Sequence, residues 1–380
     1  MTSPAEAYAD SLIGQPGSRW KLPTPALVVD LDAFEANIAR MAERTAAAAV
    51  ALRPHAKTHK SAFIAKRQIE AGAVGVCCAK LGEAEALAAA GVDDILVTSP
   101  IASPPVAERA AALAKTCPRL AVTIDDPLGV VLLAEATAKT GAELAVQIDV
   151  DVGTHRTGVA DADAALEIAE GLAAWPQLAL RGVQGYGGHW QHLVGADKRL
   201  EAAREGMARL AAVVQALRGR GHDCPLVTGG GTGTSTEDLA LGVLNEVQPG
   251  SYIFMDNQYV DALGADDDGA FATALFVHAQ VISANAPRWV TIDAGLKAFA
   301  TDGPKPRPAT GPYSADDYFF FGDEHGGLMR PGGGPVALGQ RVELSVPHCD
   351  PTVDRYDRMH FVRGDTLVAV EPIDARGRGQ

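Results

Sequence analysis

Short apolar segments alternate with helix-patterned segments through the first two thirds of the chain. In the helical patterns, apolar side chains recur every three or four residues; one example is 196–219, with Leu200, Met207, Leu210, Val214 and Leu217 on one face. The apolar segments between them are too short for helices. They predict buried strands at 49–53, 74–78, 94–98, 120–124, 144–149, 181–185, 225–228 and 246–249.

Strands that alternate with helices predict an α/β fold with a parallel sheet, because each helix carries the chain back across the sheet with a right-handed crossover. Eight such units close best as a TIM-type (β/α)8 barrel. A doubly wound open sheet is the alternative. Its usual marker, a GxGxxG motif after the first strand, is absent from this sequence.

After about residue 262 the pattern changes to strands with few helices. The expected strands are 273–282, 289–292, 342–346, 360–362 and 367–370. We therefore predict two domains: a barrel at 31–262 and a β-rich C-terminal domain at 263–380. An earlier strand near 23–30 precedes the first barrel strand, so we expect it to pair with the β-rich domain.

Composition narrows the function classes. The 33 Lys and Arg residues against 47 Asp and Glu give a net charge of −14, which argues against nucleic acid or an anionic membrane as the main partner. The five cysteines form no CxxC pair, so a reducing compartment is expected rather than a disulfide scaffold. Neither a signal peptide nor an 18-residue apolar run is evident, and we expect a cytoplasmic protein.

The first candidate for chemistry is Lys57, within the segment Arg53-Pro54-His55-Ala56-Lys57-Thr58-His59-Lys60. This segment follows a predicted strand and precedes a helix, which is where barrel enzymes place reactive groups. Its basic and imidazole neighbours favour the neutral amine, the form that attacks a carbonyl. A Schiff-base lysine is the hypothesis, and a solvated basic loop is the alternative.

Two glycine motifs follow the seventh and eighth predicted strands, where barrels usually bind phosphate. The first is Thr228-Gly229-Gly230-Gly231-Thr232-Gly233, and the second is Gly250-Ser251-Tyr252. Glycine lets the backbone approach a ligand closely, and exposed N–H groups bind phosphate. Ordinary glycine-rich turns are the alternative. A lysine and a phosphate site on one barrel together indicate pyridoxal 5′-phosphate.

Further candidates follow the fifth and sixth strands. Arg156 would keep a pyridine nitrogen unprotonated if it faced the cofactor ring, but an ion pair with Asp149 or Asp151 is an equal alternative. Tyr186 opens the segment after the sixth strand and is a candidate cofactor contact. The same segment carries His192, a candidate general base for which a structural role is the alternative.

His348 and Asp350 are the candidate metal ligands, in Pro347-His348-Cys349-Asp350. On an extended backbone, residues two apart face the same way, so their side chains would converge while Cys349 faces away. An imidazole with a carboxylate suits Mn²⁺ or Mg²⁺, whereas His-x-Cys would favour zinc. A hydrogen-bonded turn is the alternative.

Together these motifs resemble the D-threonine aldolase and D-serine dehydratase group of fold-type III pyridoxal-phosphate enzymes, whose barrel is similar to that of alanine racemase. The resemblance also rests on Asp293-Ala294-Gly295-Leu296-Lys297 and Asp323-Glu324-His325-Gly326. It implies that Lys57 is the Schiff-base lysine and that His348 and Asp350 bind the metal. The residues it implies for holding the cofactor are Thr232, Gly250, Ser251 and Tyr259.

Within this group, the dehydratases carry His-x-Cys and the aldolases carry His-x-Asp, so the sequence sides with the aldolases. The resemblance implies retro-aldol cleavage of a D-3-hydroxy-α-amino acid to glycine and an aldehyde by a homodimer, dependent on pyridoxal phosphate and Mn²⁺ or Mg²⁺. A metal-activated water, His192 or His59 would take the hydroxyl proton. The alternatives are a D-serine or D-3-hydroxyaspartate dehydratase, then a racemase or a non-catalytic pyridoxal-phosphate protein.

Overall fold

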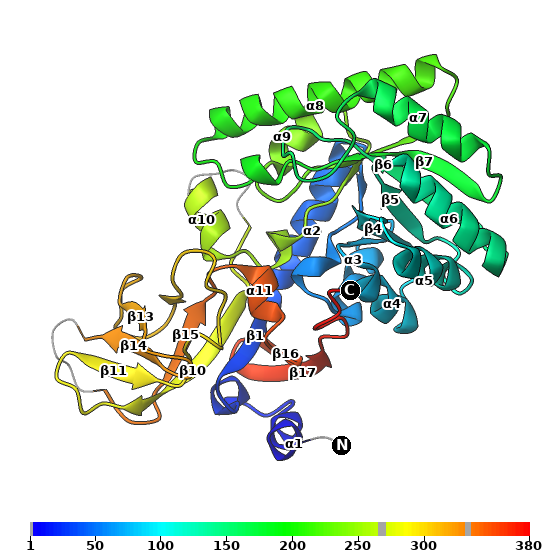
Figure 1. Cartoon of the computed structure of the whole chain (residues 1–380). Helices are drawn as coiled ribbons and strands as arrows, with labels where there is room; N and C mark the ends of the chain where they lie inside the picture. The colour runs from blue at the N-terminus through cyan, green and yellow to red at the C-terminus, as the bar shows by residue number, and fades with distance from the viewer. Residues whose placement is uncertain (1–2, 265–270, 331–335) are drawn as a thin grey trace. The chain divides into compact units, whose positions relative to one another are not determined.

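The computed structural model describes residues 3–264, 271–330 and 336–380 (Figure 1). Its backbone contacts divide the chain into two compact units. The barrel unit comprises Arg40–Gly250 and Gly377–Gln380, and the β-rich unit comprises Met1–Ala39 and Ser251–Arg376. We propose 31–262, and 263–380 together with the strand near 23–30, as the two functional domains.

The barrel unit is built on an eight-stranded sheet in which every neighbouring pair is parallel. Its spatial order is β2-β9-β8-β7-β6-β5-β4-β3. The strands are β2 Ala51–Leu52, β3 Val76–Cys78, β4 Ile95–Pro100, β5 Ala121–Ile124, β6 Leu144–Asp149, β7 Leu178–Gly185, β8 Leu226–Gly229 and β9 Glu246–Val247. All eight predicted strands are present, and the predicted barrel with a separate β-rich sheet is confirmed.

The two ends of this row meet, which closes the barrel. Across the seam the Val74 N–H donates to the Leu52 carbonyl at 2.9 Å, and the Cys77 N–H donates to the Pro54 carbonyl at 2.8 Å. A parallel bridge also joins His55 to Cys77. The seam therefore runs directly beside the segment that carries Lys57.

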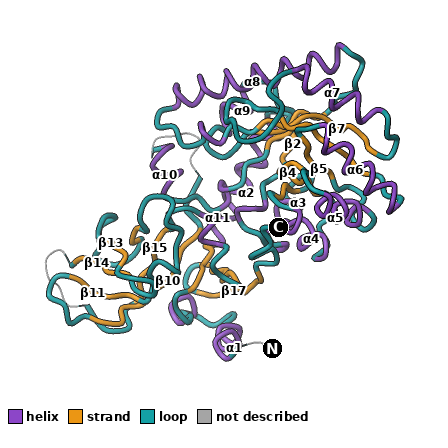
Figure 2. The backbone as a smooth tube through the Cα atoms, viewed as in Figure 1, coloured by secondary structure: helices purple, strands orange, loops and turns teal. Residues whose placement is uncertain are grey.

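Helices return the chain between the parallel strands and lie outside the sheet (Figure 2). Their ends follow sequence signals: Asp126 accepts a hydrogen bond from Leu128 N–H at the start of α6, and Gly141 ends that helix with φ 65°. The helices are α3 Ala62–Glu70, α4 Leu81–Ala89, α5 Pro104–Ala114, α6 Pro127–Thr140, α7 Ala162–Ala173, α8 Ala196–Gly219 and α9 Ser235–Ala240. A further helix, α2 Leu31–Ala47, leads from β1 Ala26–Asp30 into the first barrel strand.

The β-rich unit is built on a nine-stranded sheet with the path β13-β14-β11-β10-β1-β16-β17, and β15 pairs with β10 and β12. Strand β1 pairs antiparallel with β10 and parallel with β16, which confirms the predicted pairing of the N-terminal strand. The strands are β1 Ala26–Asp30, β10 Leu275–Ser283, β11 Trp289–Ile292, β12 Arg307–Pro308, β13 Tyr318–Phe320, β14 Gly326–Met329, β15 Arg341–Ser345, β16 Arg358–Arg363 and β17 Thr366–Pro372.

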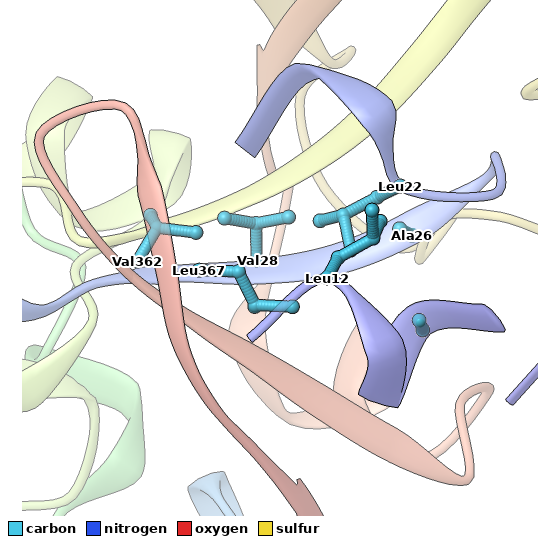
Figure 3. Close-up of a cluster of buried hydrophobic side chains, with 7 residues drawn as sticks. Leu12, Leu22, Ala26, Val28, Val362 and Leu367 are labelled. Atoms are coloured by element: carbon cyan, nitrogen blue, oxygen red, sulfur yellow. The ribbon is translucent and has the colours of Figure 1, made fainter. Parts of the chain in front are cut away.

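Short helices accompany this sheet, and its N-terminal strand is part of an apolar core. Figure 3 shows the core, formed by Leu12, Leu22, Ala26, Val28, Val362 and Leu367 together with Ala9. The helices are α1 Pro4–Ser11, α10 Asn257–Leu263 and α11 Cys349–Val353, with the short 3-10 segments η1 Ser18–Lys21 and η4 Ser251–Ile253. Burial of these side chains joins the first residues of the chain to its last strands.

The five cysteines are all free and buried. In the described ranges, no helix has the length and apolar character needed to span a membrane.

A prediction concerns His360 on β16. Its Nδ1 donates to the Leu27 carbonyl at 3.0 Å, and burial lowers the pKa of the imidazole to about 4. The unfolded chain, with a His pKa of about 6.5, takes up this proton first as the pH falls. We therefore expect this site to cost about 2 kcal/mol of unfolding free energy between pH 7 and pH 5. Urea unfolding at the two pH values measures this loss.

The matched comparison uses His360→Gln and His325→Gln, since His325 is exposed in the same unit. The His360 variant is expected to lose much of the pH dependence, and the His325 variant is expected to keep it. Equal pH dependence in both variants would contradict the assignment.

Candidate active site

Lys57 lies in a 3-10 turn, η2 Ala56–Thr58, directly after β2. The His55 imidazole caps this turn by accepting the Lys57 backbone N–H at 3.4 Å. The half-buried Lys57 side chain places Nζ 6.0 Å from the centroid of the Tyr186 ring. The neighbouring cation, Lys60, lies 3.6 Å from a Glu83 carboxylate oxygen. The lysine therefore occupies the carboxyl end of a barrel strand, as predicted.

Arg156 approaches the same aromatic ring. Its guanidinium carbon lies 5.4 Å from the Tyr186 centroid, so a lysine and an arginine gather around one tyrosine. Among the described residues, Arg156 forms no ion pair with Asp149 or Asp151, which was the alternative to a cofactor contact. Asp149 instead accepts hydrogen bonds from Thr157 and Gln184, and Asp151 pairs with His155 at 2.7 Å.

Asp149 ties together the two segments that carry Arg156 and Tyr186. Thr157 Oγ1 donates to one of its oxygens at 2.7 Å, and Gln184 Nε2 donates to the other at 3.1 Å. Burial raises the pKa of Asp149 to about 6, against the lowering effect of these two hydrogen bonds. The carboxylate is therefore ionised at neutral pH and holds both donors.

The second glycine motif packs against the lysine turn. A Cβ on Gly250 would lie 2.7 Å from Thr58 Oγ1 and 3.1 Å from the His55 carbonyl oxygen, so only glycine permits this approach. The two glycine motifs are also joined, because the Gln248 N–H donates to the Gly229 carbonyl at 2.8 Å. The barrel unit alone therefore assembles Lys57, Tyr186, Arg156, the 229–234 loop and Gly250.

The other predicted cofactor residues, Ser251 and Tyr259, belong to the β-rich unit. Both are buried, and the Tyr259 N–H donates to Asp256 Oδ1 at 3.0 Å. The two candidate bases differ in exposure. His59 is fully buried, and its Nδ1 accepts the Ser61 N–H at 3.1 Å, whereas His192 is exposed after η3 Gly188–Trp190.

His348 and Asp350 come together in the β-rich unit, with Nε2 3.6 Å from Oδ2. The predicted extended geometry is wrong: His348 is the N-cap of α11, and Asp350 lies in the first turn of that helix. Cys349 is fully buried, and its N–H donates to Asp256. In the described residues, no cluster of three or more His, Cys, Asp or Glu side chains suits a metal, so a bound cation would need other ligands such as water or substrate.

Asp302 was not predicted from the sequence, but it holds the other side of the His348 ring. Its Oδ2 lies 2.9 Å from Nδ1, which leaves Nε2 facing Asp350. Burial alone would lower the pKa of His348, but the hydrogen bonds and charges of Asp350 and Asp302 raise it to about 9. A carboxylate on the far nitrogen is the usual support for a metal-binding histidine. The glycine-rich loop around Asp302 gives no sequence signal for this contact.

Left-handed backbone conformations mark the same loops. The non-glycine residues with positive φ in the described ranges are Ala49, Lys60, His155 and Met255. Three of them lie within four residues of a candidate site residue: Lys60 after Lys57, His155 before Arg156, and Met255 after Ser251. Such conformations are unfavourable for side chains with a Cβ and occur often near functional sites.

The residues present fit pyridoxal phosphate. The donor set is a lysine at a strand end, an arginine, an aromatic ring and a glycine loop that side chains would fill. A parallel barrel with this lysine turn and an additional β-rich sheet has the architecture of the alanine racemase-like fold.

The comparisons agree with that architecture. Residues 29–258 match the family model described as alanine racemase, N-terminal domain, and residues 274–362 match a putative serine dehydratase domain. The chain is 37% identical over 366 residues to a 3-hydroxy-D-aspartate aldolase of Paracoccus denitrificans, covering 94% of this chain and 93% of the relative. It is 38% identical over 369 residues to a D-threonine aldolase of an Arthrobacter species, covering 96% and 95%.

A solved structure of D-threonine aldolase from Filomicrobium marinum superposes with a TM-score of 0.90 at 37% identity, covering 94% of this chain and 97% of the other. The chain therefore belongs to the alanine racemase family, in the branch in which the barrel is followed by a serine dehydratase-type domain.

Proposed function

We propose that this protein is a lyase that cleaves a D-3-hydroxy-α-amino acid, such as D-threonine, to glycine and an aldehyde, with pyridoxal phosphate and a divalent metal. The observation that carries the proposal is the position of Lys57 at the barrel mouth, beside Tyr186 and Arg156. The named aldolases at 37% and 38% identity, matched over more than nine tenths of each chain, support the same reaction class.

Different barrel residues would hold different parts of the cofactor. Pyridoxal phosphate, when bound, supplies an aldehyde that condenses with amines and a ring that accepts the electrons of the broken Cα–Cβ bond. Lys57 presents its amine from a rigid turn, which Gly250 and His55 hold in place. Arg156 is permanently cationic, so it disfavours a proton on any nitrogen that it faces. Tyr186 offers an aromatic face, and the glycine loop at 230–233 would receive the phosphate.

His348 and Asp350 would hold the metal, and we propose Mn²⁺ or Mg²⁺ because the second ligand is a carboxylate rather than a thiolate. A divalent ion there lowers the pKa of a bound alcohol. His192 is better placed than His59 to take the alcohol proton, because His192 is exposed and His59 is fully buried. Exposure lets a base exchange protons with substrate and solvent.

The second candidate is a dehydratase that releases a keto acid and ammonia from the same substrates. This second candidate is supported by the similarity to a D-threo-3-hydroxyaspartate dehydratase of a Delftia species, which is 34% identical over 285 residues. Asp350 favours the aldolase, and a product assay separates the two. We further propose, as the family resemblance implies, a homodimer in the cytoplasm, where five unpaired cysteines would stay reduced.

One prediction tests the lysine. Lys57→Ala is expected to abolish glycine formation from D-threonine in the presence of Mn²⁺, because it removes the amine that lies 6.0 Å from the centroid of the Tyr186 ring. Borohydride treatment of the unmodified protein with pyridoxal phosphate is expected to fix the cofactor on the peptide that contains Lys57. Peptide mass spectrometry identifies the site of attachment, and chromatographic measurement of glycine gives the activity.

Lys66→Ala is the matched control, since Lys66 is an exposed lysine on α3. It is expected to retain full activity. Undiminished glycine formation in Lys57→Ala would end the proposal, and keto acid with ammonia as the products would favour the dehydratase.

A further prediction tests the metal site through Asp302. Asp302→Asn removes the carboxylate that orients His348, so we expect Mn²⁺ affinity to fall by about 10- to 100-fold. Asp350→Ala removes a proposed ligand and is expected to weaken Mn²⁺ binding further. Isothermal titration of the chelator-treated protein measures both effects without a turnover assay.

Asp261→Asn serves as the control, because Asp261 is an aspartate of the same unit that pairs with Arg307 instead. It is expected to bind Mn²⁺ as the unmodified protein does. If Asp302→Asn and Asp261→Asn bound the ion equally well, Asp302 would have no role in the metal site.

A further inference from the structure

The glycine loop after β8 is held by a buried carboxyl group on α9. Asp238, 1% exposed, accepts the Gly231 N–H at 3.0 Å and the Thr234 hydroxyl at 2.7 Å, both through Oδ2. Both bonds reach back four to seven residues from the helix into the loop. Asp238 thus fixes the loop at a backbone point and at a side chain.

A glutamine from a different segment completes this support. Gln191, fully buried after η3, accepts the Gly233 N–H at 2.9 Å through Oε1. Its Nε2 donates to the Thr234 hydroxyl at 2.8 Å, and that hydroxyl in turn donates to Asp238. Gln191, Thr234 and Asp238 therefore form one continuous hydrogen-bonded chain beneath the loop, which we call the loop brace.

The loop brace explains why three positions of this loop are glycines. A Cβ on Gly230, where φ is +73°, would lie 2.5 Å from Asp238 Oδ2. A Cβ on Gly231 would lie 2.5 Å from Gln191 Oε1, and one on Gly233 would lie 1.9 Å from the Gln191 carbonyl oxygen. The N–H groups of Gly231 and Gly233 already have protein acceptors. These glycines are therefore required by contact with the brace, besides any approach of a ligand.

The charge of Asp238 suits a position under an anion. Burial raises the pKa of this carboxyl to about 7, and the nearby Glu237 carboxylate, 3.7 Å from Arg199, adds to the effect. Its second oxygen, Oδ1, is buried and has no hydrogen-bond partner in the described ranges, so a proton can reside there. A neutral carboxyl still accepts both hydrogen bonds through Oδ2 while it repels a phosphate less than a carboxylate would.

We propose that Asp238 and Gln191 are positioning residues for the cofactor phosphate, which hold loop 230–234 in the shape that receives it. This inference rests on the proposed function, because it takes the ligand of the loop to be the phosphate of pyridoxal phosphate. The brace then contributes to cofactor binding through the phosphate alone. Pyridoxal, which has the same ring and aldehyde but no phosphate, is then indifferent to the brace.

The experiment titrates the full-length protein, freed of cofactor, with pyridoxal phosphate and separately with pyridoxal, and follows the absorbance of the bound ligand. Asp238→Ala is expected to weaken pyridoxal phosphate binding by about 30-fold or more, since it leaves a buried N–H and a hydroxyl unpaired. Asp238→Asn keeps one acceptor oxygen and no charge, so it is expected to restore affinity to within about fivefold. Pyridoxal binding should change by less than about threefold in both variants.

Gln191→Ala provides an independent arm and is expected to show the same selective loss. Asp126→Ala is the matched control, because Asp126 caps α6 in the same unit through an equivalent side-chain bond to a backbone N–H. It should leave both affinities unchanged. If circular dichroism shows that Asp238→Ala is unfolded, Gln191→Ala and Asp238→Asn test whether the brace contributes selectively to phosphate binding.

Equal loss of pyridoxal and pyridoxal phosphate affinity would overturn the inference, because it would show a general loss of structure. So would unchanged affinity for both ligands in Asp238→Ala and Gln191→Ala. Failure of the unmodified protein to bind pyridoxal phosphate would instead overturn the proposed function, and the two failures are therefore distinguishable.

Discussion

The position of Lys57 depends on one buried cation at the seam of the barrel. Arg53 is 1% exposed and donates to Glu246 at 3.0 Å and to Asp94 at 2.6 Å. Glu246 belongs to β9 and Asp94 precedes β4, so one guanidinium connects strands on both sides of the seam. Loss of that guanidinium would leave the buried Glu246 carboxylate without this cation, which is among the costliest changes in a protein interior. Lys57 is only four residues further along the chain.

From this seam the support extends to the glycine motifs. The His55 N–H donates to the Pro249 carbonyl at 3.1 Å, and Gly250 lies against Thr58 without room for a side chain. Gln248 then joins β9 to the end of β8, where the braced loop begins. The lysine and the loop are thus parts of one hydrogen-bonded scaffold. A site that must hold an amine and a phosphate at a fixed separation needs this rigidity, because misplacement by an ångström is costly for catalysis.

The sequence was sufficient for the parts of this arrangement that local patterns encode. Short apolar runs predicted the eight strands, and the placement of Lys57 and of the glycine motifs after their strands followed from chain order. The pairs that long-range contacts create were not predictable: Gln191 with Gly233 and His348 with Asp302 are separated by 42 and 46 residues. The geometry of His348 and Asp350 was wrong for a local reason. His348 and Asp350 were expected on an extended backbone, but α11 begins at Cys349, and Pro351 at the third position of that helix is tolerated in a first turn.

The polar interior at the carboxyl end of the barrel explains how separate loops become one site. Gln184 on β7 donates to Asp149 on β6 and to the Thr98 carbonyl on β4, and it accepts a hydrogen bond from Gln248. An apolar layer would pack as well there but would not fix the rotation of the strand ends. Hydrogen bonds are directional, so each strand end is held in one orientation relative to its neighbours. The Asp149 carboxylate, with its pKa near 6, then restrains the segments of Arg156 through Thr157 and of Tyr186 through Gln184. This polar layer would therefore shape the proposed cofactor environment as well as stabilise the barrel.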